Sequence, residues 1–267
     1  MFESKLISRL ARELHDAERT RIQIPQFSQR YPDITLEDGY RIGCEWVRIK
    51  VEEGQQIRGR KIGLTSRAMQ QAAQLDEPDY GVLLDQMFFE NGGEIPYDQF
   101  ITPRVEIEIA FILKSALKGP GVTIFDVINA TDHIIPSAEI IDSRLVRVDP
   151  ETGSTRKIVD TIADNAANAG VVLGGAPSRS QDVNLRWQGG IIFRNGIIEE
   201  TGLGGGVLGH PANGVAWLAN RIAPWDEQLN AGDVVLAGSF TRPVDAARGD
   251  VFHLEFDALG SISFRFS

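Results

Sequence analysis

The segment PRVEIEIAF, residues 103–111, holds two glutamates that alternate with apolar residues. On a strand this spacing turns Glu106 and Glu108 to one face, where their carboxylates repel each other. A third carboxylate, Glu139, stands among apolar residues in IIPSAEIID, where an unpaired charge is costly. Three oxygen ligands without clustered histidine or cysteine match a hard divalent cation, Mg²⁺ or Mn²⁺. A cation bound by all three would make the repulsion favourable.

A simpler interpretation stays open for the same residues. Glu106 and Glu108 would then face solvent, and Glu139 would pair with an arginine such as Arg104 or Arg144. For the first two glutamates alone the two interpretations are evenly balanced. The third carboxylate favours the metal site.

Two further charged residues could serve chemistry next to such a metal. Lys61 lies in GRKIGLTS, either on the surface or as an electrostatic partner and proton donor for a bound anion. Asp79 lies in EPDYGVLLD, where turn formation alone could explain it. Ser239 and Thr241 in GSFTRP stand at the end of an expected strand, from which they could hydrogen-bond a ligand. The residues alone leave these roles undecided.

Other motifs argue against several classes of site. Gly204, Gly206 and Gly209 form a G-x-G-x-x-G match, but an antiparallel hairpin precedes it, so we expect a loop leading into a helix instead of a dinucleotide site. The four histidines show no metal-ligand spacing, and Ser239 lacks the G-x-S-x-G context of triad hydrolases. The single cysteine, Cys44, excludes an intrachain disulfide, and an inert buried thiol is favoured.

The elements that must position these residues divide the chain in two. Residues 1–55 read as a helical N-terminal segment, with a second helix starting at Thr35. Residues 56–267 read as a β-rich domain with helices near 122–132, 160–168 and 211–222. Asn195-Gly196 between two apolar runs predicts a hairpin. The fold class is therefore α+β: a β-rich body with a small helical N-terminal part.

Composition and charge restrict where and with what the protein works. The chain of 267 residues has 27 basic and 37 acidic residues and a formal charge of -10, which argues against non-specific nucleic-acid binding. Its N-terminus lacks an apolar core long enough for a signal peptide or membrane span, so we expect a cytoplasmic protein. Leu6, Ile7, Leu10 and Leu14 form an apolar stripe on the first helix, which we expect to pack on the rest of the protein; the same stripe also favours a homo-oligomer.

Taken together, GRKIGLTS, EPDYGVLLD, PRVEIEIAF, PSAEIID, DTIADNAANAG, HPANGVAWLAN and GSFTRP resemble the hydratase/decarboxylase branch of the fumarylacetoacetate hydrolase superfamily. The resemblance covers essentially the whole chain, and it implies a β-rich fold built on a mixed, rolled sheet. It further implies Mg²⁺ or Mn²⁺ held by Glu106, Glu108 and Glu139, with Lys61 and Asp79 at the active site. The loop GLGGGVLGH is richer in glycine than is usual for the family.

The resemblance also implies a reaction. DPETGSTRKIVDTIADNAANAG and LLDQMFFENGGEIP favour a hydratase that adds water to 2-hydroxyhepta-2,4-diene-1,7-dioate in meta-cleavage degradation of homoprotocatechuate. We expect Lys61 to stabilise the enolate or relay protons, Asp79 to orient Lys61 or activate water, and Leu64, Thr65, Ser239 and Thr241 to bind substrate. The alternatives are a 2-hydroxypentadienoate hydratase, a 4-oxalocrotonate decarboxylase, and a non-catalytic subunit of a complex.

Overall fold

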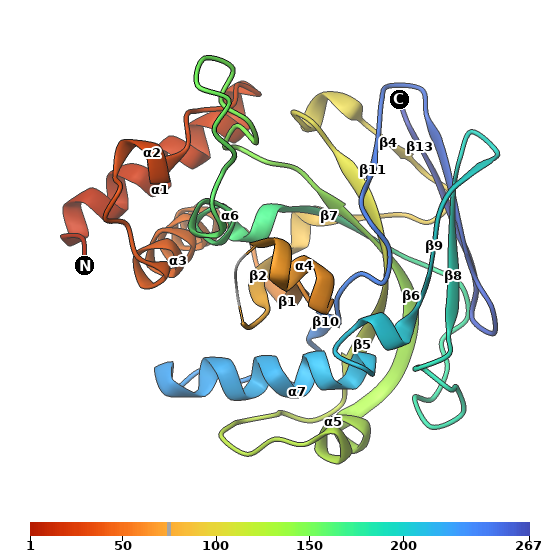
Figure 1. Ribbon diagram of the computed structural model, residues 1–267. Coiled ribbons are helices and arrows are strands. Elements are labelled where there is room, and N and C mark those ends of the chain that lie inside the picture. The colour runs from red at the N-terminus through yellow and green to blue at the C-terminus, as the bar shows by residue number, and fades with distance from the viewer. Residues whose placement is uncertain (74–75) are drawn as a thin grey trace.

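The structure is a computed structural model that describes residues 1–73 and 76–267 (Figure 1). Its α-helices are α1 (Ser4–Thr20), α2 (Phe27–Arg30), α3 (Leu36–Glu52), α4 (Arg67–Ala73), α5 (Ile124–Ala130), α6 (Ile158–Ala163) and α7 (Pro211–Ile222). Its strands are β1 (Ile57–Gly63), β2 (Asp79–Leu84), β3 (Phe88–Phe89), β4 (Glu94–Ile95), β5 (Arg104–Leu113), β6 (Thr131–Ile141), β7 (Asn168–Leu173), β8 (Gly189–Arg194), β9 (Ile197–Leu203), β10 (Val234–Leu236), β11 (Val244–Asp245), β12 (Val251–Phe256) and β13 (Gly260–Phe266). The expected α+β class with a helical N-terminal part is confirmed.

The strands form two sheets. The larger has the order β2-β1-β10-β5-β6-β7-β3, with β11 also paired to β5, and it is mixed because β1 and β10 run parallel. The smaller has the order β4-β13-β12-β8-β9 and stands to the right in Figure 1. Helix α7, with α5 beneath it, lies below the larger sheet in the same view. One large apolar core joins the two sheets and these helices.

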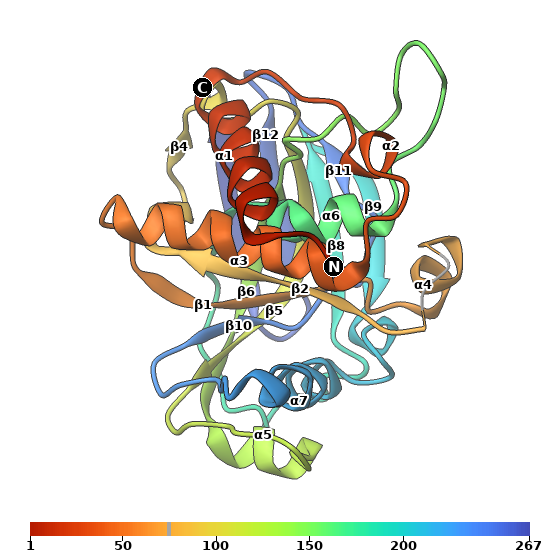
Figure 2. The same ribbon diagram turned by 90° about the vertical axis from the view of Figure 1, so that its left-hand side faces the viewer.

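The N-terminal helices pack against the edge of the larger sheet (Figure 2). Helix α3 begins as predicted, because Thr35 and Asp38 form a reciprocal capping box in which each side chain accepts from the other's backbone N–H. The stripe on α1 packs inside the chain, since Ile7, Leu10 and Leu14 share a buried cluster with residues of α3 and β2. The stripe therefore offers no support for self-association, and the homo-oligomer stays a prediction for light scattering to check.

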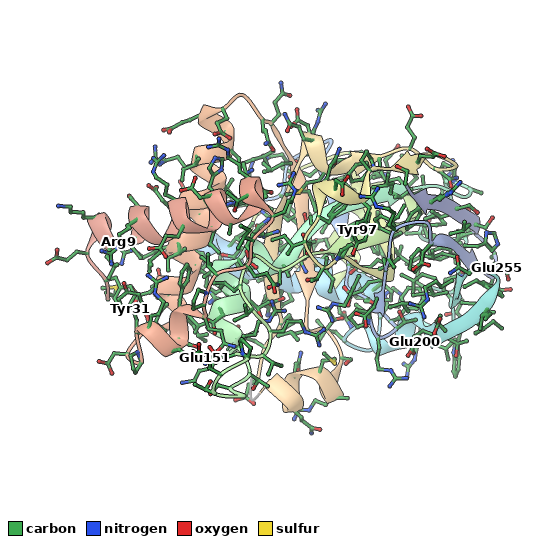
Figure 3. All side chains as sticks on the ribbon, turned by 90° about the horizontal axis from the view of Figure 1, so that it is seen from above. Arg9, Tyr31, Tyr97, Glu151, Glu200 and Glu255 are labelled. Atoms are coloured by element: carbon green, nitrogen blue, oxygen red, sulfur yellow. The ribbon has the colours of Figure 1, made fainter. Side chains whose placement is uncertain are left out.

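Seen from above, the molecule is elongated, with the N-terminal helices and the smaller sheet at opposite ends (Figure 3). Arg9 and Tyr31, which hydrogen-bond at 2.7 Å, mark the helical end, while Glu200 and Glu255 mark the sheet end. Strands β5 and β6 lie between these ends, so the three glutamates stand on the central strands of the larger sheet.

Local signals set several boundaries. The hairpin of β8 and β9 turns at Asn195 and Gly196, whose φ values of 55° and 79° fit the predicted turn. The glycine-rich stretch 204–209 is a loop leading from antiparallel β9 into α7, as predicted. The helix expected at 122–132 is shorter because β6 begins at Thr131, and the one expected at 160–168 runs from Ile158 to Ala163 and is followed by a 3-10 turn over Asn165–Ala167.

Two features differ from the sequence interpretation. Helix α4 follows β1 without having been predicted. Cys44 is exposed on α3, so the expectation of a buried thiol was wrong; the helix turns this position away from its buried face. Among the described residues, no helix combines the length and apolar character needed to cross a membrane.

Candidate metal centre and active site

The register of β5 and β6 brings the three glutamates together. Glu106 stands directly opposite Glu139, and Glu108 follows two positions along β5, so all three carboxylates project from one face of the sheet. One carboxylate oxygen of each lies within 4.8 Å of the others. The sequence predicted the alternation on β5, and the sheet supplies the pairing with β6.

The surroundings of the carboxylates leave room for a cation. Glu108 Oε2 accepts a hydrogen bond from Gly238 N at 2.9 Å, and Glu139 Oε1 accepts from Asn168 Nδ2 at 2.8 Å. Glu108 Oε1 and Glu139 Oε2 are buried and have no hydrogen-bond partner in the part of the chain that the structure describes. Because buried anionic oxygens rarely lack a partner, these two fit the oxygen ligands that a hard divalent ion requires.

The electrostatics of the cluster agree with this fit. Burial, followed by repulsion from Glu139, raises the pKa of Glu106 to about 7. Burial and the negative charges of Glu139 and Glu106 raise the pKa of Glu108 well above its ordinary value. Without a counter-charge these carboxyls would hold protons near neutrality, and a divalent cation would favour their ionised forms.

Lys61 extends from β1 to the same cluster. Its Nζ lies 3.2 Å from Glu139 Oε1, and only 4% of the residue is exposed. Burial lowers the pKa of Lys61, but Glu139 and Asp79 outweigh this effect and raise it. Glu139 is therefore neutralised by Lys61 and not by an arginine, as the alternative interpretation expected. Arg144 instead pairs with Asp164 at 2.5 Å. Lys61 is therefore a buried ammonium, not a surface residue.

Asp79 reaches the site through a glycine. In the antiparallel pair of β1 and β2, Gly63 stands opposite Asp79, and a Cβ on Gly63 would lie 2.2 Å from Asp79 Oδ1. Only a residue without a side chain leaves space for this carboxylate. Asp79 is 2% exposed, and its Oδ1 lacks a hydrogen-bond partner among the described residues. Burial raises its pKa, and the positive charge of Lys61 lowers it, with a net rise.

The structure brings the other predicted residues to the border of this cluster. Thr65 is buried, and its side chain fills the space where Gly238 would carry a Cβ, so it packs on the backbone that supports Glu108. Leu64 has a φ of 54°, and its carbonyl accepts from Gln70. Ser239 Oγ donates to backbone carbonyls and accepts from Thr241 N, so its hydroxyl holds its own loop together. Contact of these four residues with substrate stays a prediction.

Two residues near the three carboxylates were not predicted from the sequence to belong to the site. Ser137 stands opposite Glu108 in the β-ladder, is fully buried, and has a hydroxyl without a partner among the described residues. It precedes Glu139 by two positions, so strand alternation could have placed it on the same face. Asn168 holds Glu139 from the start of β7, and nothing local in the sequence indicates that contact.

A hollow of about 640 Å³ opens beside Thr65. Its wall combines the start of α4, the glycine-rich loop before α7 and the turn before β2, including Gln70, Glu77, Leu208 and Trp217. Through Thr65 the hollow thus adjoins Gly238, whose backbone N–H supports Glu108.

Comparison with known proteins places the chain in a family. No family model matches the chain. It is 56% identical over 266 residues to the 2-oxo-hept-4-ene-1,7-dioate hydratase of Escherichia coli, with 100% of each protein covered. It superimposes with a TM-score of 0.94 and 34% identity on the 4-oxalocrotonate decarboxylase of Pseudomonas putida G7 complexed with magnesium and adipate, covering 100% of this chain and 99% of that one.

A more distant structure shares the fold alone. This is a protein from Yersinia pestis described as belonging to the fumarylacetoacetate hydrolase family, with a TM-score of 0.58 and 13% identity over 78% of this chain and 92% of that one. The full-length identity to a hydratase and the superposition on a decarboxylase lead to one assignment. The chain belongs to the hydratase/decarboxylase branch of the fumarylacetoacetate hydrolase superfamily.

Proposed function

We propose that the protein is a metal-dependent hydratase that converts 2-hydroxyhepta-2,4-diene-1,7-dioate, a tautomer of 2-oxohept-4-ene-1,7-dioate, to 4-hydroxy-2-oxoheptane-1,7-dioate. The observation that carries the proposal is the 56% identity to the Escherichia coli hydratase over the full length of both chains. The carboxylate cluster with Lys61 and Asp79 supports it. As part of the same proposal, the reaction belongs to meta-cleavage degradation of homoprotocatechuate or 4-hydroxyphenylacetate.

We assign Glu106, Glu108 and Glu139 as ligands of Mg²⁺ or Mn²⁺. The unpartnered buried oxygens of Glu108 and Glu139 support the assignment, as do burial and the repulsion among the carboxylates, which raise the pKa of Glu106 and Glu108. A divalent ion in this place would supply Lewis-acid chemistry and positive charge toward the 2-oxo acid end of the substrate. Asn168 and Gly238 orient two of the ligands, which keeps the carboxylates in place before the ion binds.

Lys61 and Asp79 divide the proton chemistry in this proposal. Protonation at C5 with loss of the proton on the C2 oxygen gives a 2-oxo-3-ene. Water then adds its hydroxyl to C4 and a proton to C3. Lys61 Nζ carries only donors, so it stabilises the negative charge that develops on the C2 oxygen. Asp79 Oδ1 is buried and accepts no hydrogen bond among the described residues, which supports a role in taking a proton from the attacking water.

We further propose that Leu64 and Thr65 line the substrate's path. Thr65 borders the 640 Å³ hollow and also packs on Gly238, whose backbone N–H donates to Glu108. Ser239 and Thr241 would act through their loop, which follows directly on Gly238. Exchanging Thr65 for Val keeps the shape and removes the hydroxyl. A higher KM in that variant with metal affinity retained would support this role.

The proposed function is tested by product analysis. The purified protein with Mg²⁺ is given 2-hydroxyhepta-2,4-diene-1,7-dioate, and loss of the conjugated diene is followed by ultraviolet absorbance. Mass spectrometry must then find a product heavier than the substrate by one water. A diene that persists for hours with saturating Mg²⁺ and micromolar enzyme would contradict the proposal.

A second candidate is the decarboxylase reaction, which the TM-score of 0.94 with a decarboxylase favours. Given 4-oxalocrotonate, a decarboxylase releases CO₂, whereas a hydratase retains every carbon. The same assay with 2-hydroxypenta-2,4-dienoate separates a hydratase for the shorter substrate. A non-catalytic subunit would turn over none of these compounds without a partner enzyme.

A further inference from the structure

Three arginines stand at or beyond the end of β5 and β6 that lies nearest Glu106. Arg104 lies two positions before Glu106 on β5, so it projects from the same face as the glutamates. Arg147 and Arg156 stand at the base of the loop between β6 and α6, where Arg156 N donates to Arg147 O at 2.9 Å. Glu151 marks the far part of this loop in Figure 3. The loop thus holds two arginines side by side.

This loop leaves the sheet next to Arg104. Arg104 pairs with Ile141, the last residue of β6, and the chain reaches Ser143 two residues later. Ser143 Oγ accepts a hydrogen bond from Arg156 Nη1. This contact holds the Arg156 guanidinium beside the segment that follows β6.

None of these arginines belongs to an ion pair within 4.0 Å in the described part of the chain, although Asp245 faces Arg104 across β11. Arg104 and Arg156 are partly buried, and Arg147 is exposed. Arg156 has Asp164 beyond the Ser143 hydroxyl that it contacts, whereas an anion that joins Arg104 and Arg147 would be stabilised by both. Glu106 is likewise partly exposed, whereas Glu108 and Glu139 are buried, so the cluster opens on the side that carries Arg104.

The spacing fits one class of anion. Two residues of strand separate Arg104 from Glu106, which corresponds to about 6.6–6.8 Å. Six bonds join C1 to C7 of a heptanedioate, as many as two residues of backbone, and in extended form they span about 7 Å. A seven-carbon dicarboxylate with its C1 end at the glutamates would therefore end at Arg104.

The charges select the same end. Four carboxylates, Lys61 and a divalent ion leave the centre with a small net negative charge, which three arginines reverse in favour of a dianion. The hollow beside Thr65 carries Asp76 and Glu77 together with Arg67, and Glu77 pairs with Arg221, so it offers a terminal carboxylate no surplus of positive charge. Building on the proposed function, we propose that Arg104 and Arg156, assisted by Arg147, bind the distal carboxylate of the substrate and select a dicarboxylate over a monocarboxylate.

The test compares two ligands that differ only in that carboxylate. 2-Oxoheptanedioate and 2-oxoheptanoate have the same chain and no double bond to hydrate, so their binding is measured by calorimetry with saturating Mg²⁺. The unaltered protein is expected to bind the dioate about 10–150-fold more tightly, as for hydrogen bonds to charged groups. Arg104→Gln and Arg156→Gln should each remove most of that ratio. Arg104→Lys should restore part of it, because it keeps the charge without the guanidinium geometry.

Arg48→Gln, an exposed arginine on α3, is the control and should leave the ratio unchanged. Equal binding of the two ligands to the unaltered protein overturns the inference, as does a full ratio in both glutamine variants. Failure of both ligands to bind with Mg²⁺ overturns the proposed function and this inference with it. Circular dichroism establishes folding; if Arg104→Gln does not fold, Arg156→Gln on the loop decides.

Discussion

Replacing Lys61 by Met tests how the negative charge of Glu139 is neutralised. Lys61 Nζ and Glu139 Oε1 are 3.2 Å apart in a buried setting. At an effective dielectric constant of about 20 their attraction is about 5 kcal/mol, most of which offsets the cost of burying both charges. Removing one member of such a pair typically costs about 3–5 kcal/mol, because the other charge stays buried and unpaired. The metal-free variant should lose that much stability, a large share of a domain's total.

Bound Mg²⁺ should change this loss, because the cation would compensate Glu139 in place of Lys61. Chemical unfolding with and without Mg²⁺ therefore measures whether the ion stabilises the Lys61→Met variant more than the unaltered protein. Metal affinity should be retained or increased, since a competing positive charge has gone. Turnover at saturating Mg²⁺ should still fall about 10²–10³-fold, mainly in kcat, because one preorganised charge is missing where the enolate forms.

Lys118→Met serves as the control, since Lys118 pairs with Asp226 on the surface, where solvent screens the pair and its loss should hardly change stability. An equal loss of stability with and without Mg²⁺ would refute the idea that Lys61 and the cation both neutralise the charge of Glu139. Turnover like that of the unaltered protein would refute the role of Lys61 in the reaction.

Three further predictions concern single residues. Glu139→Gln should weaken Mg²⁺ binding by at least about 100-fold in calorimetry while Glu255→Gln does not; an unchanged affinity would remove Glu139 from the ligand set. Gly238→Ala should lower Mg²⁺ affinity about 10–100-fold, because the new Cβ would lie 2.4 Å from Thr65 Cγ2 and would displace the backbone N–H that donates to Glu108. Gly54→Ala is the control and should leave the affinity unchanged, because the space around Gly54 is open. For Asp38, burial raises the pKa but hydrogen bonds from Phe2 and Thr35 outweigh it and lower the pKa, so its stabilisation exists above pH ~4 and is lost as pH falls through the folded pKa. Asp38→Asn should cost about 1–3 kcal/mol near neutrality and little at pH ~2, and a cost independent of pH would contradict this.

Local patterns predicted the parts of the fold that depend on near neighbours. The capping box at Thr35 and Asp38 involves residues three apart, and the Asn195-Gly196 turn needs only its own backbone. Alternation likewise placed Glu106 and Glu108 on one face, because a strand has a fixed period of two. These features require no knowledge of distant residues.

The remaining features come from tertiary contacts. Asn168 reaches Glu139 only because β7 pairs with β6, and Asp79 enters the site only because Gly63 faces it across β1 and β2. No spacing within the sequence encodes either meeting. For Cys44 the prediction was wrong because it relied on residue type alone. Cysteine is usually buried, but the position of Cys44 on α3 turns its side chain to solvent.

The pairing of Glu106 with Glu139 has a consequence for how the chain folds. A shift of β6 by two residues against β5 keeps every apolar side chain on its own face, so hydrophobic patterning cannot reject it. The shift would place Arg104 opposite Glu139 and replace a repulsive pair by an attractive one. Without a cation, the misaligned strand pair would thus compete with the native register of a long-range pairing. A divalent ion bound by the glutamates would favour the native register.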